Sequence, residues 1–231
     1  MVRVLDEVLA PAPGRGRFHE LRTACLLTAD GRRYVSGTGV TFLHHVRAAV
    51  QACLDRSLRV LADGAAWMRT FFRDHPAALP QAEMLLAWYH LARTCEDLAA
   101  QIYPNRARRS ALLRRLLRAL WTGNVERALT VLKDQRRHAA DLQAVDDLSR
   151  YLRARAAWIP TYRARRRTCR YIGSGLAEKA NDRLLVRRQK RRGMQGGAQT
   201  SDALAALRTL HLNEGWDHYW QERHLLRLTA A

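Results

Sequence analysis

Three acidic residues occupy positions where they could carry out chemistry. Glu178 follows a Gly-Ser-Gly turn and precedes a cluster of arginines, Asp63 ends an apolar stretch, and Asp6 lies within another. Positions at strand ends and helix starts are held rigidly while remaining open to solvent. Carboxylates on such elements can hold two Mg²⁺ or Mn²⁺ ions about 3.5–4 Å apart, which activate a water or hydroxyl for phosphoryl transfer.

Each of these acids also has a purely structural interpretation. An Asp-Gly pair such as Asp63-Gly64 is most often a turn, and an acid in a first helical turn often only complements the helix dipole. Asp6 could be a solvated residue at a strand edge. Asp182 lies one turn after Glu178 on the same predicted helical face, so it could replace Glu178 as a ligand.

The elements that must position the acids alternate between strands and helices. Residues 2–9 and 18–39 predict a three-stranded meander with a hairpin at Asp30-Gly31. Apolar spacing then predicts a helix with Thr41 as its N-cap. The expected order is β-β-β-α-β-α-β, with the fourth strand stopping at Asp63 and a weaker fifth strand over 82–90. In this arrangement we expect the first and fourth strands to be neighbours.

The rest of the chain has a helical pattern. We expect helices throughout residues 91–170, including one that restarts on Asn124 as a cap. Two further helical stretches, over 176–190 and 201–227, are separated by a glycine-rich hinge. The prediction is therefore an α/β protein with about eighty residues of helical insertion.

Composition indicates an anionic partner. The 231 residues include 40 Lys and Arg against 21 Asp and Glu, a formal net charge of +19. Such a field attracts polyanions, and nucleic acid is the first to consider. No apolar run approaches the length of a spanning helix and no signal-peptide pattern opens the chain, so we expect a cytoplasmic, nucleoid-associated protein. The four cysteines contain no C-x-x-C pair, which favours buried reduced thiols over a zinc knuckle or disulfides.

Arginine clusters flank the proposed catalytic glutamate, where a DNA backbone would have to lie. We expect largely sequence-independent contacts to phosphates, because no motif for reading base edges is present. The expected DNA-binding residues are Arg166, Arg167, Arg170, Arg183, Arg187, Arg188, Lys190, Arg191 and Arg192.

The remaining aromatic and histidine residues have structural interpretations. Most tryptophans, together with Tyr89, are expected in the core. His44 and His45 lack partners at metal-ligand spacing.

Several motifs resemble those of one family. Residues 171–220 carry a Gly-Ser-Gly-x-x-Glu elbow, a basic helix, a Gly-Met segment and a final tryptophan-rich end. Upstream, "VLADGAAWMRTFF", "LLAWYHLARTCEDLA" and the first strand with its meander follow in the matching order. Together these segments resemble bacterial insertion-sequence DDE transposases of the ISKra-type group, which is related to mutator-like transposases.

The resemblance implies an RNase H-like core interrupted by a helical insertion. It divides the chain at 1–90, 91–170 and 171–231, the last segment completing the core. It also implies two-metal DNA cleavage and strand transfer with Asp6, Asp63 and Glu178 as catalytic ligands, His90 as active-site support, and self-association on element ends and target DNA.

The sequence departs from the family pattern in ways that leave a second interpretation open. Ala87 stands where the family has an aspartate, Gly196 replaces an expected tryptophan, and Met1 lies only five residues before Asp6. These departures favour a truncated or domesticated DNA-binding derivative without turnover. An RNA-binding structural protein would explain the charge but not the placed acids.

Overall fold

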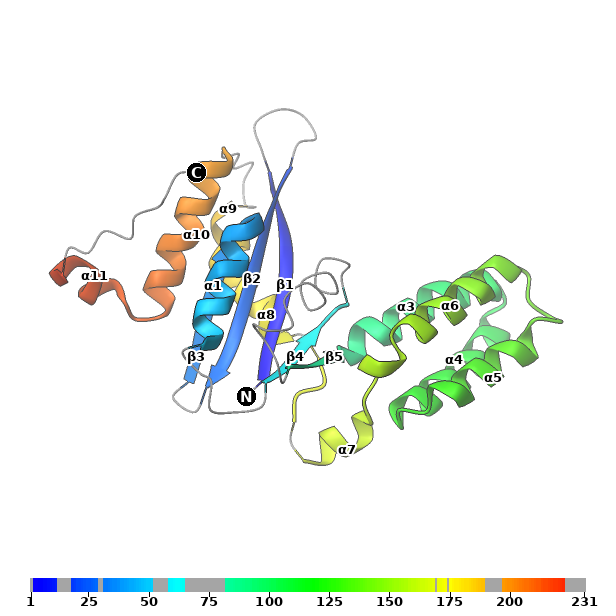
Figure 1. The fold of residues 1–231 in the computed structure, drawn as a ribbon. Helices are drawn as coiled ribbons and strands as arrows, with labels where there is room; N and C mark the ends of the chain where they lie inside the picture. Colours follow the sequence, from blue (N-terminus) through cyan, green and yellow to red (C-terminus); the bar gives the residue numbers. More distant parts are fainter. Residues whose placement is uncertain are drawn as a thin grey trace. The chain divides into compact units, whose positions relative to one another are not determined.

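The computed structural model describes residues 2–11, 18–28, 31–51, 58–64, 82–168, 170–173, 175–189 and 197–222. The chain is α/β and forms two compact units (Figure 1). The sheet unit comprises residues 1–60, 75–82 and 174–231. The helical unit comprises residues 61–74 and 83–173.

Five strands form the sheet in the described part of the chain. β1 (Val2–Pro11), β2 (Phe18–Thr28) and β3 (Gly31–Gly37) pair antiparallel as the predicted meander. β4 (Leu58–Ala62) and β5 (Ala82–Leu86) complete the strand order β3-β2-β1-β4-β5. The prediction that the first and fourth strands are neighbours is therefore confirmed. The helix predicted between β4 and β5 falls in residues 65–81, outside the described residues.

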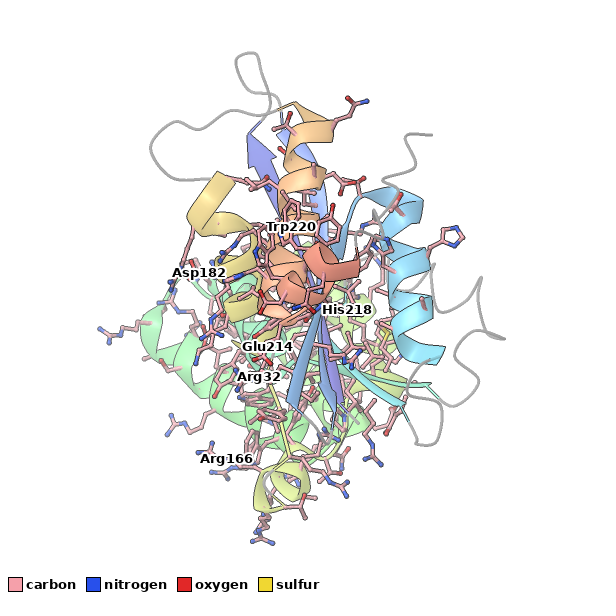
Figure 2. All side chains as sticks on the ribbon, turned by 90° about the vertical axis from the view of Figure 1, so that its left-hand side faces the viewer. Arg32, Arg166, Asp182, Glu214, His218 and Trp220 are labelled. Carbon is pink, nitrogen blue, oxygen red and sulfur yellow. The ribbon has the colours of Figure 1, made fainter. Side chains whose placement is uncertain are left out.

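Both faces of β2 are buried. Residues that alternate along a strand point to opposite faces, so burial of both sets requires cover on each side. Figures 1 and 2 show α1 (Gly39–Gln51) on one face of the meander and α8 (Gly175–Asn181) on the other. The buried residues of β2 are Leu21, Thr23 and Cys25 on one face and Ala24 and Leu26 on the other.

The start of α1 differs from the prediction. The helix begins at Gly39, and the amide of Phe42 donates to the carbonyl of Thr38 at 3.2 Å. Thr41 therefore lies inside the helix, and its prediction as the N-cap is wrong. The apolar spacing indicated the helix correctly but did not locate its first turn, because the two residues before Thr41 also adopt helical geometry.

The C-terminal helices complete the sheet unit. α8 continues through a π-helical turn (Asp182–Val186) into α9 (Arg187–Gln189). Next come α10 (Ala198–Leu212) and α11 (Trp216–Glu222). The predicted helicity is confirmed where the chain is described, but a break at residues 213–215 separates α10 from α11. Polar contacts tie α10 and the turn after it to β3: Ser36 Oγ lies 2.6 Å from Thr209 Oγ1, and the Asn213 side chain bonds both the amide and the carbonyl of Tyr34 at 2.8 Å.

Within the described residues, five α-helices build the helical unit. They are α3 (Trp88–Ile102), α4 (Arg106–Trp121), α5 (Val125–Gln135), α6 (Leu142–Ala154) and α7 (Tyr162–Arg167). β5 ends at Leu86, so the predicted strand over 82–90 is four residues too long. Its last three residues, Trp88 to His90, instead form the first turn of α3.

Side-chain caps fix three of these helix starts, at Asn105, Asn124 and Asp141. Asn105 accepts from the amides of Ala107 and Arg108 at 3.0 and 3.1 Å. The predicted cap Asn124 is confirmed, since its oxygen accepts from the amide of the third residue of α5 at 2.9 Å. Such caps satisfy amide groups that have no partner within the helix.

The helical unit has its own apolar core. Buried residues of α3, α4, α5 and α6 form it, including Leu116 of α4 and Leu148 of α6. Trp88 and Trp121 pack against this core and form an aromatic group with Tyr162. The Tyr162 hydroxyl donates to the carbonyl of the last residue of β5 at 2.8 Å, which satisfies the polar end of a buried ring. The core placement of these tryptophans is confirmed. In the described part of the chain no helix has the length and apolarity needed to cross a membrane.

Candidate active site

Glu178 and Asp6 belong to elements that pack together in the sheet unit. In the antiparallel register Asp6 lies opposite Thr23. The Thr23 hydroxyl hydrogen-bonds the side-chain oxygen of Asn181, three residues after Glu178 in α8. The helix carrying the glutamate therefore packs beside the register position of Asp6. The side chain of Asp6 lies outside the described part of the chain.

Glu178 is exposed in the first turn of α8, as predicted. A carboxylate is stabilised at this end of a helix by the partial positive charge of the free amides. Asp182 is different, because its Oδ2 lies 2.6 Å from Nε of Arg187. An ion pair with an arginine competes with any cation for the Asp182 carboxylate.

Asp63 immediately follows β4 in the helical unit. The carbonyl of the preceding residue, Ala62, accepts from the amide of Ala87 at 2.7 Å. The next residue, Gly64, has φ +82, and a Cβ there would come within 3.1 Å of Leu86 Cδ1 and 3.2 Å of Arg155 Nε. This left-handed φ favours glycine. Asp63 therefore lies between the hydrogen-bonded end of β4 and a residue in the left-handed conformation.

Arg155 and Tyr151 both interact with the Asp63-Gly64 pair. The Arg155 guanidinium lies 4.1 Å from the centre of the Tyr151 ring and donates from Nη2 to the Gly64 carbonyl at 3.4 Å. Burial raises the pKa of the Tyr151 hydroxyl, and the negative charge of Asp63 contributes in the same direction. The sequence analysis predicted neither residue. Tyr151 in α6 and Arg155 directly after it lie about ninety residues beyond Asp63 in the chain, and only the fold brings them to the end of β4.

The segment before the Gly-Ser-Gly elbow lies against the start of α3. The amide of Trp88 donates to the Ile172 carbonyl at 2.7 Å. A Cβ on Gly173 would fall 2.5 Å from Cδ2 of Tyr89, so only glycine permits this approach. Three segments, 62–64, 87–89 and 171–173, therefore lie side by side in the helical unit. In the sequence, Glu178 follows five residues after the last of them.

Tyr89 and His90 lie on the surface at this point. Tyr89 is 64% exposed, so its predicted core position is wrong; its ring instead covers Gly173. His90 is exposed, and its carbonyl accepts from the Thr94 hydroxyl at 3.0 Å. Its role as active-site support stays a prediction.

The predicted DNA-binding residues fall into several groups. Arg166, Arg167 and Arg170 are exposed, and Figure 2 shows Arg166 extending outward from α7. Arg183 is also exposed, whereas Arg187 is engaged by Asp182. Outside the described residues or side chains lie Arg188, Lys190, Arg191 and Arg192.

Arg165, in the same sequence run, has a structural role. It is only 8% exposed, and its Nε and Nη2 donate to the Tyr171 carbonyl at 3.3 and 3.1 Å. These two hydrogen bonds hold the backbone just before the Gly-Ser-Gly elbow at residues 173–175. A buried arginine within an exposed run is not evident from sequence, because its acceptor is a backbone carbonyl.

The aromatic residues of α11 are more exposed than predicted. Trp220 is 58% exposed and Trp216 is 39% exposed, and their rings pack edge to face with centroids 5.7 Å apart. The prediction that they pack in the core is wrong, because the rings of the short α11 pack against each other and both remain exposed.

The described side chains hold no group of three His, Cys, Asp or Glu residues placed to bind a metal, a set from which Asp6 is missing. The donors Asp63 and Glu178 suit Mg²⁺ chemically, since this hard cation prefers carboxylate oxygens.

His44 and His45 are exposed, with His45 Nδ1 3.2 Å from the Ser36 carbonyl. Cys25 and Cys95 are buried free thiols, as predicted, and Cys53 and Cys169 lie outside the described residues.

Comparison with known proteins adds no identification. No protein-family model matches the chain, and no curated protein matches it either.

Proposed function

We propose that the chain is the catalytic domain of an insertion-sequence DNA transposase, with Asp6, Asp63 and Glu178 as its catalytic carboxylates. One observation carries the proposal. The helix of Glu178 packs, through Asn181 and Thr23, beside the register position of Asp6 on the central strand β1. Two of the three acid-bearing elements thus meet within one unit, although 172 residues of sequence separate the acids.

The fold supports the same proposal. An RNase H-like core requires an antiparallel meander whose first strand is followed in the sheet by the fourth, and the strand order β3-β2-β1-β4-β5 agrees with this requirement. Asp63 stands directly after β4. The helices α3 to α7 supply the expected insertion between the fifth strand and the elbow.

The proposed chemistry divides between metal and protein. When bound, two Mg²⁺ or Mn²⁺ ions would activate the attacking oxygen and stabilise the leaving oxygen. Water would attack the phosphodiester and break its P–O3′ bond, which leaves a 5′ phosphate and a free 3′ hydroxyl. That hydroxyl would then attack a target phosphodiester, forming a new P–O bond while the target's P–O3′ bond breaks and its 3′ oxygen leaves as a hydroxyl. Asp6, Asp63 and Glu178 would hold the ions, and the exposed arginines of α7 would bind flanking phosphates.

Ala87 favours a second candidate, a non-catalytic DNA-binding derivative of a transposase. Ala87 is fully buried, and its amide bonds the carbonyl of Ala62, the residue before Asp63. The family resemblance leads one to expect an aspartate at this position. The protein therefore lacks one acid beside the strand end that precedes Asp63, which would weaken a catalytic site without affecting the basic surface.

Cleavage of supercoiled plasmid tests the proposal. The parent chain should nick and join DNA only with Mg²⁺ or Mn²⁺, and Glu178→Gln should reduce both reactions to background while binding DNA normally. Glu126→Gln is the matched control, because Glu126 is also an exposed glutamate in a first helical turn. It should leave activity unchanged.

Two other outcomes would contradict the proposal. If parent and Glu178→Gln chains bind plasmid equally and neither cuts it, the non-catalytic derivative is the correct function. If RNA displaces DNA from the parent at equal concentration and no cleavage occurs, an RNA-binding protein is favoured instead.

A further inference from the structure

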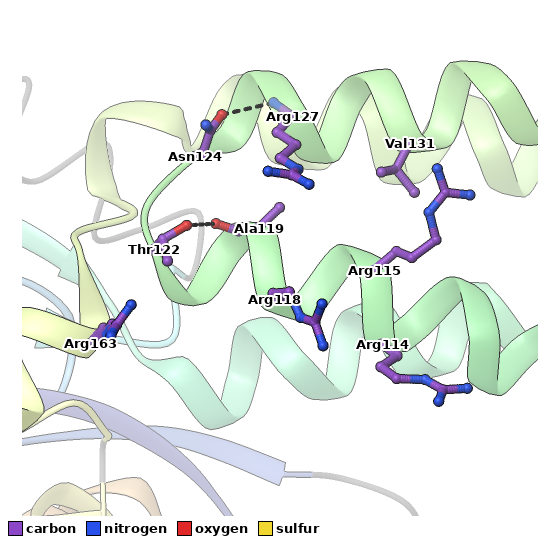
Figure 3. A pocket seen from close by; sticks show the side chains of 9 residues that line it. All are labelled: Arg114, Arg115, Arg118, Ala119, Thr122, Asn124, Arg127, Val131 and Arg163. Carbon is purple, nitrogen blue, oxygen red and sulfur yellow. Dashed lines mark hydrogen bonds between the residues drawn. The ribbon is translucent and has the colours of Figure 1, made fainter.

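The helical unit contains a groove lined by five arginines. It has a volume of about 400 Å³ and lies between α4 and α5 (Figure 3). Figure 3 shows Arg127 extending from α5 toward Ala119 of α4. The lining residues are Arg114, Arg115, Arg118, Ala119, Thr122, Asn124, Arg127, Val131 and Arg163.

A tight turn brings these arginines together. Gly123, between α4 and α5, has φ +74, and a Cβ there would lie 3.1 Å from Thr161 Oγ1 and 3.3 Å from the carbonyl carbon of Pro160. Only glycine allows the turn to approach the segment that leads into α7. This contact places Arg163, two residues later, at the end of the groove where α4 and α5 are joined (Figure 3).

The positive charge in the groove is poorly compensated. α4 carries six arginines and no acid. Arg114 and Arg118 are four residues apart, a spacing at which like charges destabilise a helix. Arg115 lies 3.7 Å from Asp134, an exposed pair. Among the described residues, no ion pair is found for Arg114, Arg118 or Arg127.

A second groove in the same unit shows a different pattern. It has a volume of about 470 Å³ and lies between α5 and α6. Its three basic residues, Lys133, Arg136 and Arg153, are accompanied by Glu126 and Asp146. Arg136 forms an ion pair with Asp146. The lining of this groove therefore has a formal charge of +1, from three basic and two acidic residues, whereas the five arginines of the first groove give +5.

We propose that the five-arginine groove binds the phosphate backbone of duplex DNA. Guanidinium groups bind phosphate oxygens in a bidentate manner, and several of them in one groove can follow successive phosphates. The lining residues, all in the described part of the chain, include no aromatic side chain that would hold a nucleotide base. A backbone ligand fits this lining better than a free nucleotide does.

The groove extends the proposed function by giving the helical unit its own DNA contact. It contains none of the three catalytic carboxylates, so its test is independent of cleavage. The groove variant carries Arg114→Gln, Arg118→Gln and Arg127→Gln in the full chain. The matched control carries Lys133→Gln, Arg136→Gln and Arg153→Gln, which removes the same charge from the neighbouring groove.

Fluorescence anisotropy with a labelled duplex of mixed sequence gives the affinity between about 50 and 200 mM salt. Each lost phosphate contact lowers the log–log salt slope by about 0.9, so the groove variant should lose about 2.7. Over this roughly fourfold salt range, parent affinity should fall about 40-fold more than that of the groove variant. The control variant should keep a slope within about 0.9 of the parent value.

Equal loss of slope in the two triple variants would overturn the proposal, because general charge would then explain the binding. Displacement of the duplex by inorganic triphosphate at equal phosphate concentration, only when the groove is intact, would also overturn it and indicate a free polyphosphate ligand. Tighter binding of duplex RNA than of DNA, lost in the groove variant alone, would exclude DNA as the ligand.

Circular dichroism checks that each variant is folded. Should the triple variant unfold, Arg118→Gln alone measures one contact, with an expected slope change of about 0.9 and none for Arg153→Gln. The anisotropy experiment measures DNA binding and not cleavage. An unchanged salt slope in the groove variant would therefore leave the cleavage result for Glu178→Gln unaffected. Likewise, the absence of cleavage would leave the measured salt slopes unaffected.

Discussion

The two units are stabilised in different ways. The core of the helical unit is a continuous apolar cluster contributed by all its long helices, three of which begin at side-chain caps. In the sheet unit, buried Leu21, Cys25 and Tyr34 of the meander pack against Ala180, Leu184, Leu185 and Ala205 of the C-terminal helical segments. Polar side chains also join these segments to the meander: Thr23 with Asn181, Ser36 with Thr209, and Asn213 with Tyr34.

This difference bears on function. Apolar packing tolerates little displacement, so the helical unit is suited to holding a fixed arginine surface. Polar contacts have defined partners and geometry, and in the sheet unit they set the position of the helix that carries Glu178. We therefore expect the two units to respond differently to substitution.

The largest effect is expected from the apolar core. Leu116→Ala in α4 should lower the free energy of unfolding by about 2–5 kcal/mol, because Leu116 is fully buried in the apolar cluster of the helical unit. Leu184→Ala, at a fully buried position of the sheet unit, should fall in the same range. Urea denaturation followed by circular dichroism measures both. A loss below about 1 kcal/mol for either variant would contradict the burial of that side chain.

The next effect depends on pH. Burial raises the pKa of the Cys95 thiol from 9.0 to about 12, with a smaller contribution from Glu96. The unfolded chain therefore loses this proton first, so stability is full below pH 9 and falls by up to about 1.4 kcal/mol per unit as pH rises toward 12. Cys95→Ala should flatten the decline, as measured by urea denaturation between about pH 9 and 10.

Cys25 in the sheet unit supplies the comparison. Burial also raises the pKa of its thiol, but the positive charges of Arg32 and Arg183 oppose the shift. Cys25→Ala should therefore flatten the pH profile less than Cys95→Ala. The reverse order would contradict the interpretation of the two environments.

Removing one partner of the polar contact between β2 and α8 should cost about 1–3 kcal/mol, because the other is left buried and unsatisfied. Thr23→Val and Asn181→Ala are the single variants, and both sites are buried. The double variant should be more stable than the sum of the two losses predicts. Strict additivity in this double-mutant cycle, measured by urea denaturation, would show that the two side chains are not coupled.

The smallest effect is expected at α11. Trp220 is largely exposed, so Trp220→Ala should change the free energy of unfolding by less than about 0.5 kcal/mol. Thermal and urea denaturation both measure this change. A loss of several kcal/mol would mean that the ring is buried in solution.

Local pattern predicted the elements well. The meander, the helical region over 91–170 and the cap at Asn124 depend on residues near one another in sequence, and the described part of the chain has them all. Errors of a few residues at Thr41 and at the end of β5 arose because helical geometry extends one turn beyond the apolar pattern.

Tertiary contacts were less predictable. The buried position of Arg165 depends on the Tyr171 carbonyl, and the exposure of Tyr89 follows from its close contact with Gly173. The five-arginine groove requires a turn at Gly123 that packs against residues almost forty positions later. Sequence spacing contains none of this information.

Mn²⁺ binding to the full chain with duplex DNA present, measured by electron paramagnetic resonance, tests the proposed catalytic site without relying on turnover. We predict that the parent binds two ions and that Asp6→Asn, Asp63→Asn and Glu178→Gln each lose at least one, whereas Glu126→Gln keeps both. Unchanged binding in all three variants, or no binding by the parent, would contradict the proposal that these carboxylates form a metal site.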